Sequence, residues 1–226
     1  MTTATYLKRR DELETYFDRT AAEAWEKLTS DAPVSGIRAT VRAGRDAMRE
    51  TLMGWLPDDM SGRRILDAGC GAGQLSIEAA KRGAEVVAID LSQTLVDLAA
   101  ERSQSMSLMG SIEFMVGDMF APDRGTFDHV VAMDSLIHYN TDDFINGVER
   151  LAALSAKTVL FTFAPKTPAL TAMHVVGKIF PRSDRSPAIV PHSEAEIRNR
   201  LRRNSIQGSE RIKSGFYISH AMEMTV

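Results

Sequence analysis

The residues with the clearest chemical potential form a glycine-rich turn that follows a short apolar run. Residues 65–73 read Ile-Leu-Asp-Ala-Gly-Cys-Gly-Ala-Gly, so the glycines Gly69, Gly71 and Gly73 alternate with other residues. Glycines let a backbone approach a ligand closely, and the first turn of a following helix presents unpaired N–H groups. Dinucleotide enzymes bind a pyrophosphate on such a turn, normally with the pattern G-x-G-x-x-G. The turn alone leaves open whether a ligand binds.

An acid beside this turn points to a cationic ligand. Asp67 lies two residues before the first glycine, where its carboxylate would repel a pyrophosphate. The same carboxylate would attract the cationic amino group of S-adenosylmethionine. The turn therefore favours that cofactor over a dinucleotide.

Two more acids end the next two apolar runs. Asp90 is placed to accept hydrogen bonds from ribose hydroxyls, and Asp118 from the exocyclic amine of adenine, with Leu91 and Met119 flanking the ring. Acids at the ends of three successive parallel strands lie on one rim, where open α/β sheets bind ligands. Together they favour an S-adenosylmethionine site over three unrelated surface turns.

Short apolar runs alternating with helical stretches predict the sheet that positions these acids. The expected strands are 64–68, 85–90, 112–117, 128–133 and 158–163, with helices at 74–82, 92–106 and 141–154. A further helix begins with a capping box at Ser193 and Glu196, and strands near 205–213 and 216–225 end the chain. This alternation predicts a doubly wound α/β fold with helices on both faces of the sheet.

Two segments fall outside the alternation. Residues 1–60 hold two amphipathic stretches, 5–28 and 37–55, interrupted at Pro33 and ended at Pro57. The second stretch begins with Ile37 on its apolar face, which we expect to be buried. We interpret them as an N-terminal helical cap on a cofactor-binding domain spanning 61–226. Residues 164–192 carry five prolines around a short apolar helix after the fifth strand. An insertion of this length is usually functional, and we predict a lid over the substrate.

Composition narrows the class of protein. The chain has 226 residues, 44% hydrophobic and 25% charged, with a net charge of −3. A negative chain argues against nucleic acid as a partner. With Cys70 alone, it can form no internal disulfide and has no CxxC metal motif. The sequence shows neither a secretory signal nor a membrane span, so we expect a cytoplasmic protein.

The core motifs resemble the Rossmann-like S-adenosylmethionine methyltransferases. That resemblance covers residues from Arg63 to about Phe163 and implies a seven-stranded sheet whose last strand is antiparallel. Further stretches resemble the magnesium-protoporphyrin IX O-methyltransferases of chlorophyll and bacteriochlorophyll synthesis. They are Tyr16-Phe17 with Trp25, Val41 to Gly44, Asp134 to Tyr139, Phe163 to Thr167, Phe180-Pro181 and His192 to Ile197. Together with the core motifs, they extend the resemblance over nearly the whole chain.

The resemblance implies methyl transfer to a porphyrin propionate, with magnesium belonging to the substrate and no metal bound by the protein. We expect Tyr16, Arg42 and Asp134 to complete the cofactor site. His138 is expected to orient the propionate. The other predicted substrate contacts are Tyr139, Lys166, Met173 and His174.

One position departs from the family. Chlorophyll-branch relatives carry a tyrosine implicated in catalysis four residues after the tryptophan, where this chain has Thr29. Thr29 is therefore counted as a predicted catalytic position. Either the tyrosine is dispensable, or another residue, Tyr16 or Tyr139, serves in its place.

Two alternatives remain open at the level of sequence. A methyltransferase for another apolar acceptor, such as a quinone precursor, would share every cofactor residue. A non-catalytic, cofactor-sensing scaffold for the magnesium chelatase would need no turnover, but the intact acids Asp67, Asp90 and Asp118 disfavour it. The resemblance also suggests contact with the porphyrin-binding chelatase subunit and peripheral association with the photosynthetic membrane.

Overall fold

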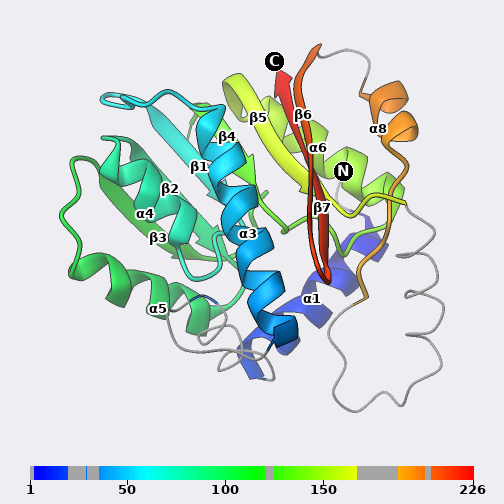
Figure 1. Ribbon diagram of the computed structural model, residues 1–226, viewed down its shortest axis with the longest axis horizontal. Helices are drawn as coiled ribbons and strands as arrows, with labels where there is room; N and C mark the ends of the chain where they lie inside the picture. Colours follow the sequence, from blue (N-terminus) through cyan, green and yellow to red (C-terminus); the bar gives the residue numbers. More distant parts are fainter. Residues whose placement is uncertain (1–2, 20–28, 30–35, 121–124, 167–187, 202–204) are drawn as a thin grey trace.

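A seven-stranded sheet forms the centre of the protein (Figure 1). The computed structural model describes residues 3–19, 29, 36–120, 125–166, 188–201 and 205–226. The strands are β1 (Arg64–Ala68), β2 (Glu85–Asp90), β3 (Ser111–Val116), β4 (Phe127–Ala132), β5 (Ser155–Phe163), β6 (Ser205–Ser214) and β7 (Tyr217–Thr225). All seven predicted strands are confirmed. The buried centres of β1, β2 and β4 explain their apolar sequences.

The strand order β3-β2-β1-β4-β5-β7-β6 reverses direction between β1 and β4. Strands β1 to β5 pair in parallel, whereas β7 is antiparallel to both β5 and β6. The predicted antiparallel last strand is thus confirmed. A ligand crevice is expected outside the carboxyl ends of β1 and β4, where the order switches. Because β7 runs the opposite way, its first residues lie at that same edge.

Helices cover both faces of the sheet (Figure 1). They are α1 (Ala4–Arg19), α3 (Gly36–Gly54), α4 (Gln74–Lys81), α5 (Gln93–Gln104), α6 (Thr141–Ala153) and α8 (Glu194–Arg200). Helices α3 and α4 bury Met48, Leu52 and Ala79 against Ile65 and Val131 on one face. Helices α6 and α8 pack on the other. Helix α3 therefore shares the hydrophobic core of the sheet.

Three local predictions were wrong. Strand β5 begins at Ser155, not Thr158, because its polar first residues carry no apolar signal although Ser155 pairs with Phe127. Ile37, assigned to the buried face of the second helix, is 57% exposed. Helix α8 begins after Ser193 as predicted, but the Ser193 side chain makes no capping hydrogen bond.

Helix α1 crosses the carboxyl edge of the sheet (Figure 1) and is hydrogen-bonded to neighbouring helices at both of its ends. Thr5 Oγ1 donates to Asp143 at the start of α6, at 2.7 Å. Ser92 Oγ, the N-cap of α5, donates to Asp18 at 2.6 Å. Between these points Tyr6 and Leu13 are buried. Helix α1 is thus fastened over the crevice by contacts at both of its ends.

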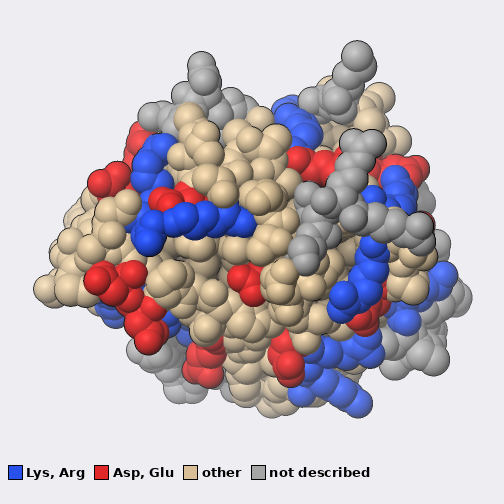
Figure 2. Space-filling view, turned by 90° about the horizontal axis from the view of Figure 1, so that it is seen from above, with Lys and Arg blue, Asp and Glu red and all other residues tan. Residues whose placement is uncertain are grey.

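The opposite edge of the sheet carries charges of both signs, which intermingle in the view from above (Figure 2). Lys157 and Arg63 pair with Asp128 there at 2.7 and 3.4 Å. The hydrogen bond from Lys157 lowers the pKa of Asp128 to about 2.

Among the described residues, no helix is both long and apolar enough to cross a bilayer.

Candidate active site

A cavity of about 270 Å³ opens at the carboxyl edge of the sheet. Its walls come from α1, α3, the glycine-rich turn, the ends of β2 and β3, the loop after β4 and the start of β7. Most of the lining is apolar, with Asp90, Asp134, Arg45 and His138 among the polar exceptions. A few placed polar groups in an apolar hollow are typical of a small-molecule site.

The glycine-rich turn forms the floor beside β1. The backbone N–H groups of Gly69 and Cys70 donate to the carbonyl of Ile89 at 2.8 and 3.0 Å, which folds the turn over the end of β2. Gly69 has a φ of 86°, and a Cβ there would lie 2.3 Å from the Cβ of Ser135. Gly69 and Gly71 line the cavity, whereas Gly73 begins α4 and packs near Ala99 instead.

Asp90 lines the cavity at the end of β2. Its Oδ2 accepts from the N–H of Gly71 at 2.8 Å, and its Oδ1 from the N–H of Ser92 at 3.0 Å. Burial raises the pKa of its carboxyl, although these hydrogen bonds act in the opposite direction. The carboxylate thus ties the turn to α5 from the wall of the cavity, and hydrogen bonds from ribose hydroxyls to Asp90 stay a prediction.

Asp67 lies behind the turn and not in the cavity wall. Only 2% of it is exposed, and it accepts a hydrogen bond from Ser76 of α4. Burial raises the pKa of its carboxyl to about 7, against the lowering effect of Ser76 and with a smaller raising effect of Asp90. Asp67 therefore supports the turn from below, and a direct pairing with the cofactor amine stays a prediction.

The buried Asp67 makes stability depend on pH. The folded protein keeps its proton up to about pH 7, whereas an unfolded chain loses it near pH 4. This contribution to stability is complete below about pH 4 and is lost as the pH rises through 7. Relative to Asp67→Asn, the wild type should lose roughly 1 kcal/mol per pH unit over that window. Urea denaturation of both proteins without cofactor, from pH 5 to 8, measures this; a constant difference would contradict it.

The third predicted acid, Asp118, is hydrogen-bonded to Tyr6, which was not predicted as a site residue. Asp118 Oδ1 accepts from the hydroxyl of Tyr6 at 2.8 Å and from the N–H of Phe120 at 2.9 Å. Arg10 lies 3.5 Å from its other oxygen. Asp118 is not part of the cavity wall, whereas Met119 and the predicted flanking residue Leu91 are. Contact between Asp118 and adenine remains a prediction.

Asp134 is the centre of a polar network at the end of β4. It is the one non-glycine residue in the described chain with a positive φ, 55°. Its carboxylate accepts from Arg45 at 2.7 Å and from the Tyr217 hydroxyl at 3.0 Å. Thr162 and Ser219 donate to the same carboxylate at 3.0 and 3.3 Å. The network joins α3, β4, β5 and β7, and its residues Arg45, Tyr217 and Ser219 were not predicted.

Gly44 creates the space that Tyr217 needs in this network. A Cβ at position 44 would lie 2.4 Å from Cδ1 of Tyr217. We expect Gly44→Ala to destabilise the protein by about 1–3 kcal/mol, because the ring must move and overpacked cores rarely adjust freely. Gly54→Ala, in the same helix with nothing within 4 Å of its Cβ, is the control and should be neutral or slightly stabilising. Thermal unfolding compares them; equal melting temperatures would contradict the argument.

The loop after β4 brings His138 and Tyr139 to the cavity. His138 is 7% exposed, and its Nδ1 lies 3.3 Å from the carbonyl oxygen of Ala188. Tyr139 stacks on Tyr6 of α1 with ring centroids 5.0 Å apart. Val190 donates to the carbonyl of Ile137 at 2.8 Å. The loop is therefore held between α1 and the segment that precedes α8.

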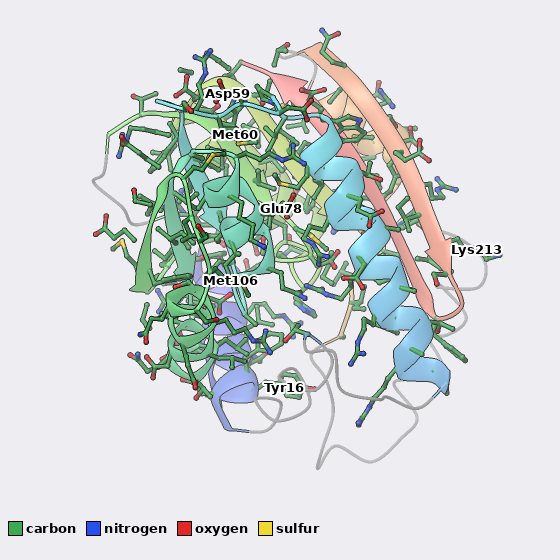
Figure 3. All side chains as sticks on the ribbon, turned by 60° about the vertical axis from the view of Figure 1, so that its left-hand side comes forward. Tyr16, Asp59, Met60, Glu78, Met106 and Lys213 are labelled. Carbon is green, nitrogen blue, oxygen red and sulfur yellow. The ribbon has the colours of Figure 1, made fainter. Side chains whose placement is uncertain are left out.

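Several predicted site residues do not line the cavity. Tyr16 lies near the end of α1 and packs on Phe17, which does line it (Figure 3). Thr29 accepts hydrogen bonds from Gln74 and Arg102 at 3.1 and 2.9 Å, beside α4 and α5. Arg42 and the exposed Lys166 are also absent from the wall. Trp25, Met173, His174 and residues 167–187 of the predicted lid lie outside the described residues.

The fold and this crevice define the class of protein. A doubly wound sheet with a glycine-rich turn after β1 and a carboxylate at the end of β2 is typical of folds that bind nucleotide-containing cofactors. The antiparallel β7 between β5 and β6 is the strand order of class I S-adenosylmethionine-dependent methyltransferases. A family model for a methyltransferase domain matches residues 65–157, and one for the C-terminus of magnesium-protoporphyrin IX methyltransferase matches 132–226.

Comparison with individual proteins specifies the family. The magnesium-protoporphyrin O-methyltransferase of Rhodobacter capsulatus is 46% identical over 219 residues, 96% of this chain and 97% of the relative. A crystal structure of the Synechocystis magnesium protoporphyrin IX methyltransferase with bound S-adenosylhomocysteine matches with a TM-score of 0.85 at 30% identity. It covers 96% of this chain and 99% of the other. The chain belongs to the magnesium-protoporphyrin O-methyltransferase family.

Proposed function

We propose that this chain transfers the methyl group of S-adenosylmethionine to a propionate carboxylate of Mg-protoporphyrin IX. The products are the monomethyl ester and S-adenosylhomocysteine, in a pathway of the chlorophyll and bacteriochlorophyll type. The observation that carries the proposal is the nearly full-length similarity to the R. capsulatus enzyme, together with a cavity that joins an apolar wall to His138.

The residues of the crevice fit the cofactor. Asp90 can accept hydrogen bonds from the ribose hydroxyls. The turn at Gly69 and Gly71 has no side chains there and can contact the methionine part of the cofactor. Leu91 and Met119 supply apolar surface for adenine. When bound, S-adenosylmethionine supplies an electrophilic methyl group, so the protein has to present an ionised oxygen to it.

His138 can keep the acceptor oxygen ionised. A propionate is ionised in neutral water, but an apolar cavity raises the pKa of a carboxyl by desolvation. A carbonyl oxygen only accepts, so in the contact with Ala188 the proton is on Nδ1 of His138. Nε2 is then the ring atom that can take a proton from the propionic acid and orient the resulting carboxylate.

An acceptor panel tests the proposed function. Purified protein is incubated with methyl-labelled S-adenosylmethionine and Mg-protoporphyrin IX, metal-free protoporphyrin IX or a catechol quinone precursor. We expect label in the porphyrin monomethyl ester, identified by chromatography. Methylation of the catechol alone would favour the quinone-type alternative. Cofactor binding without methylation of any acceptor would favour the non-catalytic scaffold.

Two associations are implied by the family resemblance. We propose that the enzyme receives its substrate from the porphyrin-binding subunit of magnesium chelatase and associates peripherally with the photosynthetic membrane. Co-purification with that subunit tests the first proposal, and flotation with anionic vesicles tests the second. Failure of either would remove that association without affecting the catalytic proposal.

A further inference from the structure

The turn between β6 and β7 forms one wall of the cavity. Phe216, Tyr217, Ile218 and Ser219 all line it, and none of them was predicted from a sequence motif. Gly215, with a φ of 55°, packs closely on Thr40 of α3 and fixes the position of the turn. The turn reaches the cofactor edge because β7 is antiparallel to β5.

This wall is apolar at its mouth. Phe216 is 56% exposed, and Ile189, on another segment of the same wall, is 42% exposed. Large apolar side chains at the mouth of a cavity expose carbon atoms to water, and the free energy of burying them under a ligand is favourable. A ligand that covers them needs a broad apolar face.

The same wall is polar further in. The hydroxyls of Tyr217 and Ser219 donate to Asp134, which also accepts from the half-buried Arg45. An arginine has five N–H donors in a fixed plane, so a second carboxylate can share the guanidinium with Asp134. The hydroxyl donors disperse the charge of Asp134, which reduces its repulsion of an incoming anion. This end of the wall suits a carboxylate.

Building on the function proposed above, we propose that the β6–β7 turn and Arg45 form the substrate-recognition element. The ring of Phe216 packs against the flat face of the macrocycle. Arg45, oriented by Asp134, to which Tyr217 also donates, binds a carboxylate of the same molecule. Phe216 and Arg45 are thus specificity-determining residues, and Asp134 is a positioning residue that acts through Arg45.

Binding of two porphyrins separates the two contacts. Mg-protoporphyrin IX and its dimethyl ester are titrated by absorbance, with S-adenosylhomocysteine present throughout. We expect Phe216→Ala to weaken the binding of both porphyrins about tenfold to a hundredfold, because the ligand no longer buries a phenylalanine side chain. Phe216→Trp should restore binding. Ile37→Ala, an equally exposed apolar residue outside the wall, should match the wild type.

Arg45 variants test the carboxylate contact. We expect Arg45→Met to weaken the binding of Mg-protoporphyrin IX, the diacid, about tenfold. Binding of the dimethyl ester should be unchanged, so that the variant no longer distinguishes the two porphyrins. Arg45→Lys keeps the charge opposite Asp134 and should retain part of the preference, which protects the test if the methionine variant folds poorly. The affinity for S-adenosylhomocysteine is measured separately, by calorimetry without porphyrin. If Arg45→Lys weakens the binding of S-adenosylhomocysteine but not that of the diacid, the carboxylate at Arg45 belongs to the cofactor and the substrate assignment is wrong.

The outcomes distinguish this inference from the function on which it rests. A wild-type protein that neither binds nor methylates Mg-protoporphyrin IX would overturn the proposed function. A wild type that does both, with Phe216→Ala and Arg45→Met both binding normally, would overturn the recognition element alone.

Discussion

His138→Ala is expected to lower turnover at least tenfold while S-adenosylhomocysteine binds within about twofold of wild type. His138 lines the cavity and its Nδ1 contacts Ala188, whereas the predicted cofactor residues Gly71 and Asp90 bond to each other. A positioned proton acceptor typically contributes about 10²–10⁴ in rate, and tenfold corresponds to about 1.4 kcal/mol. Steady-state kinetics give the turnover number, and calorimetry gives the affinity.

His138→Asn makes this test specific to proton transfer. Its amide nitrogen can replace Nδ1 as the donor to Ala188, but it has no equivalent of Nε2. We expect a rate loss similar to that of alanine with a melting temperature closer to wild type. Turnover within about twofold of wild type in the alanine variant would exclude a role for His138 at the reacting carboxylate.

The cofactor half of the site could be predicted because its signals are local. Asp90 and Leu91 follow directly from the end of an apolar strand, and the glycines follow the strand before it. Parallel strands bring their carboxyl ends to one edge, so the order of elements alone collects these residues. Side-chain direction was harder to predict: Asp67 ends in contact with Ser76, and Asp118 with Tyr6.

The partners of Asp134 could not be predicted in the same way, although Asp134 itself was expected in the cofactor site and His138 and Tyr139 at the substrate. Arg45, Asp134 and Tyr217 meet from α3, the end of β4 and β7, although Arg45 lies 89 residues before Asp134 and Tyr217 lies 83 residues after it. Nothing near Tyr217 in the sequence indicates its partner, because the contact depends on the antiparallel pairing of β7 and on the missing side chain of Gly44. Long-range packing, and not local pattern, assembles this part of the site.

Asp90→Ala tests the cofactor site as His138→Ala tests the reacting group. We expect it to weaken the binding of S-adenosylhomocysteine at least a hundredfold. The substitution removes the predicted acceptor for two ribose hydroxyls. Hydrogen bonds to a charged group contribute about 1.5–3 kcal/mol each, and two such losses amount to more than two powers of ten. It also releases the N–H groups of Gly71 and Ser92, which loosens the turn that approaches the methionine end.

Asp97→Ala is the matched control, because Asp97 is an exposed acid one turn into α5 that accepts a hydrogen bond from Gln93 of the same helix at 2.8 Å. It removes the same charge seven residues away and should change the dissociation constant less than twofold. Calorimetry is run well below the melting temperature of each variant, so that loss of binding is not loss of fold. Asp90→Asn separates charge from geometry, since its amide keeps one oxygen acceptor and should bind with intermediate affinity. If Asp90→Ala bound with wild-type affinity while folded, the ribose would lie elsewhere, and the cofactor would have to be placed anew in the crevice.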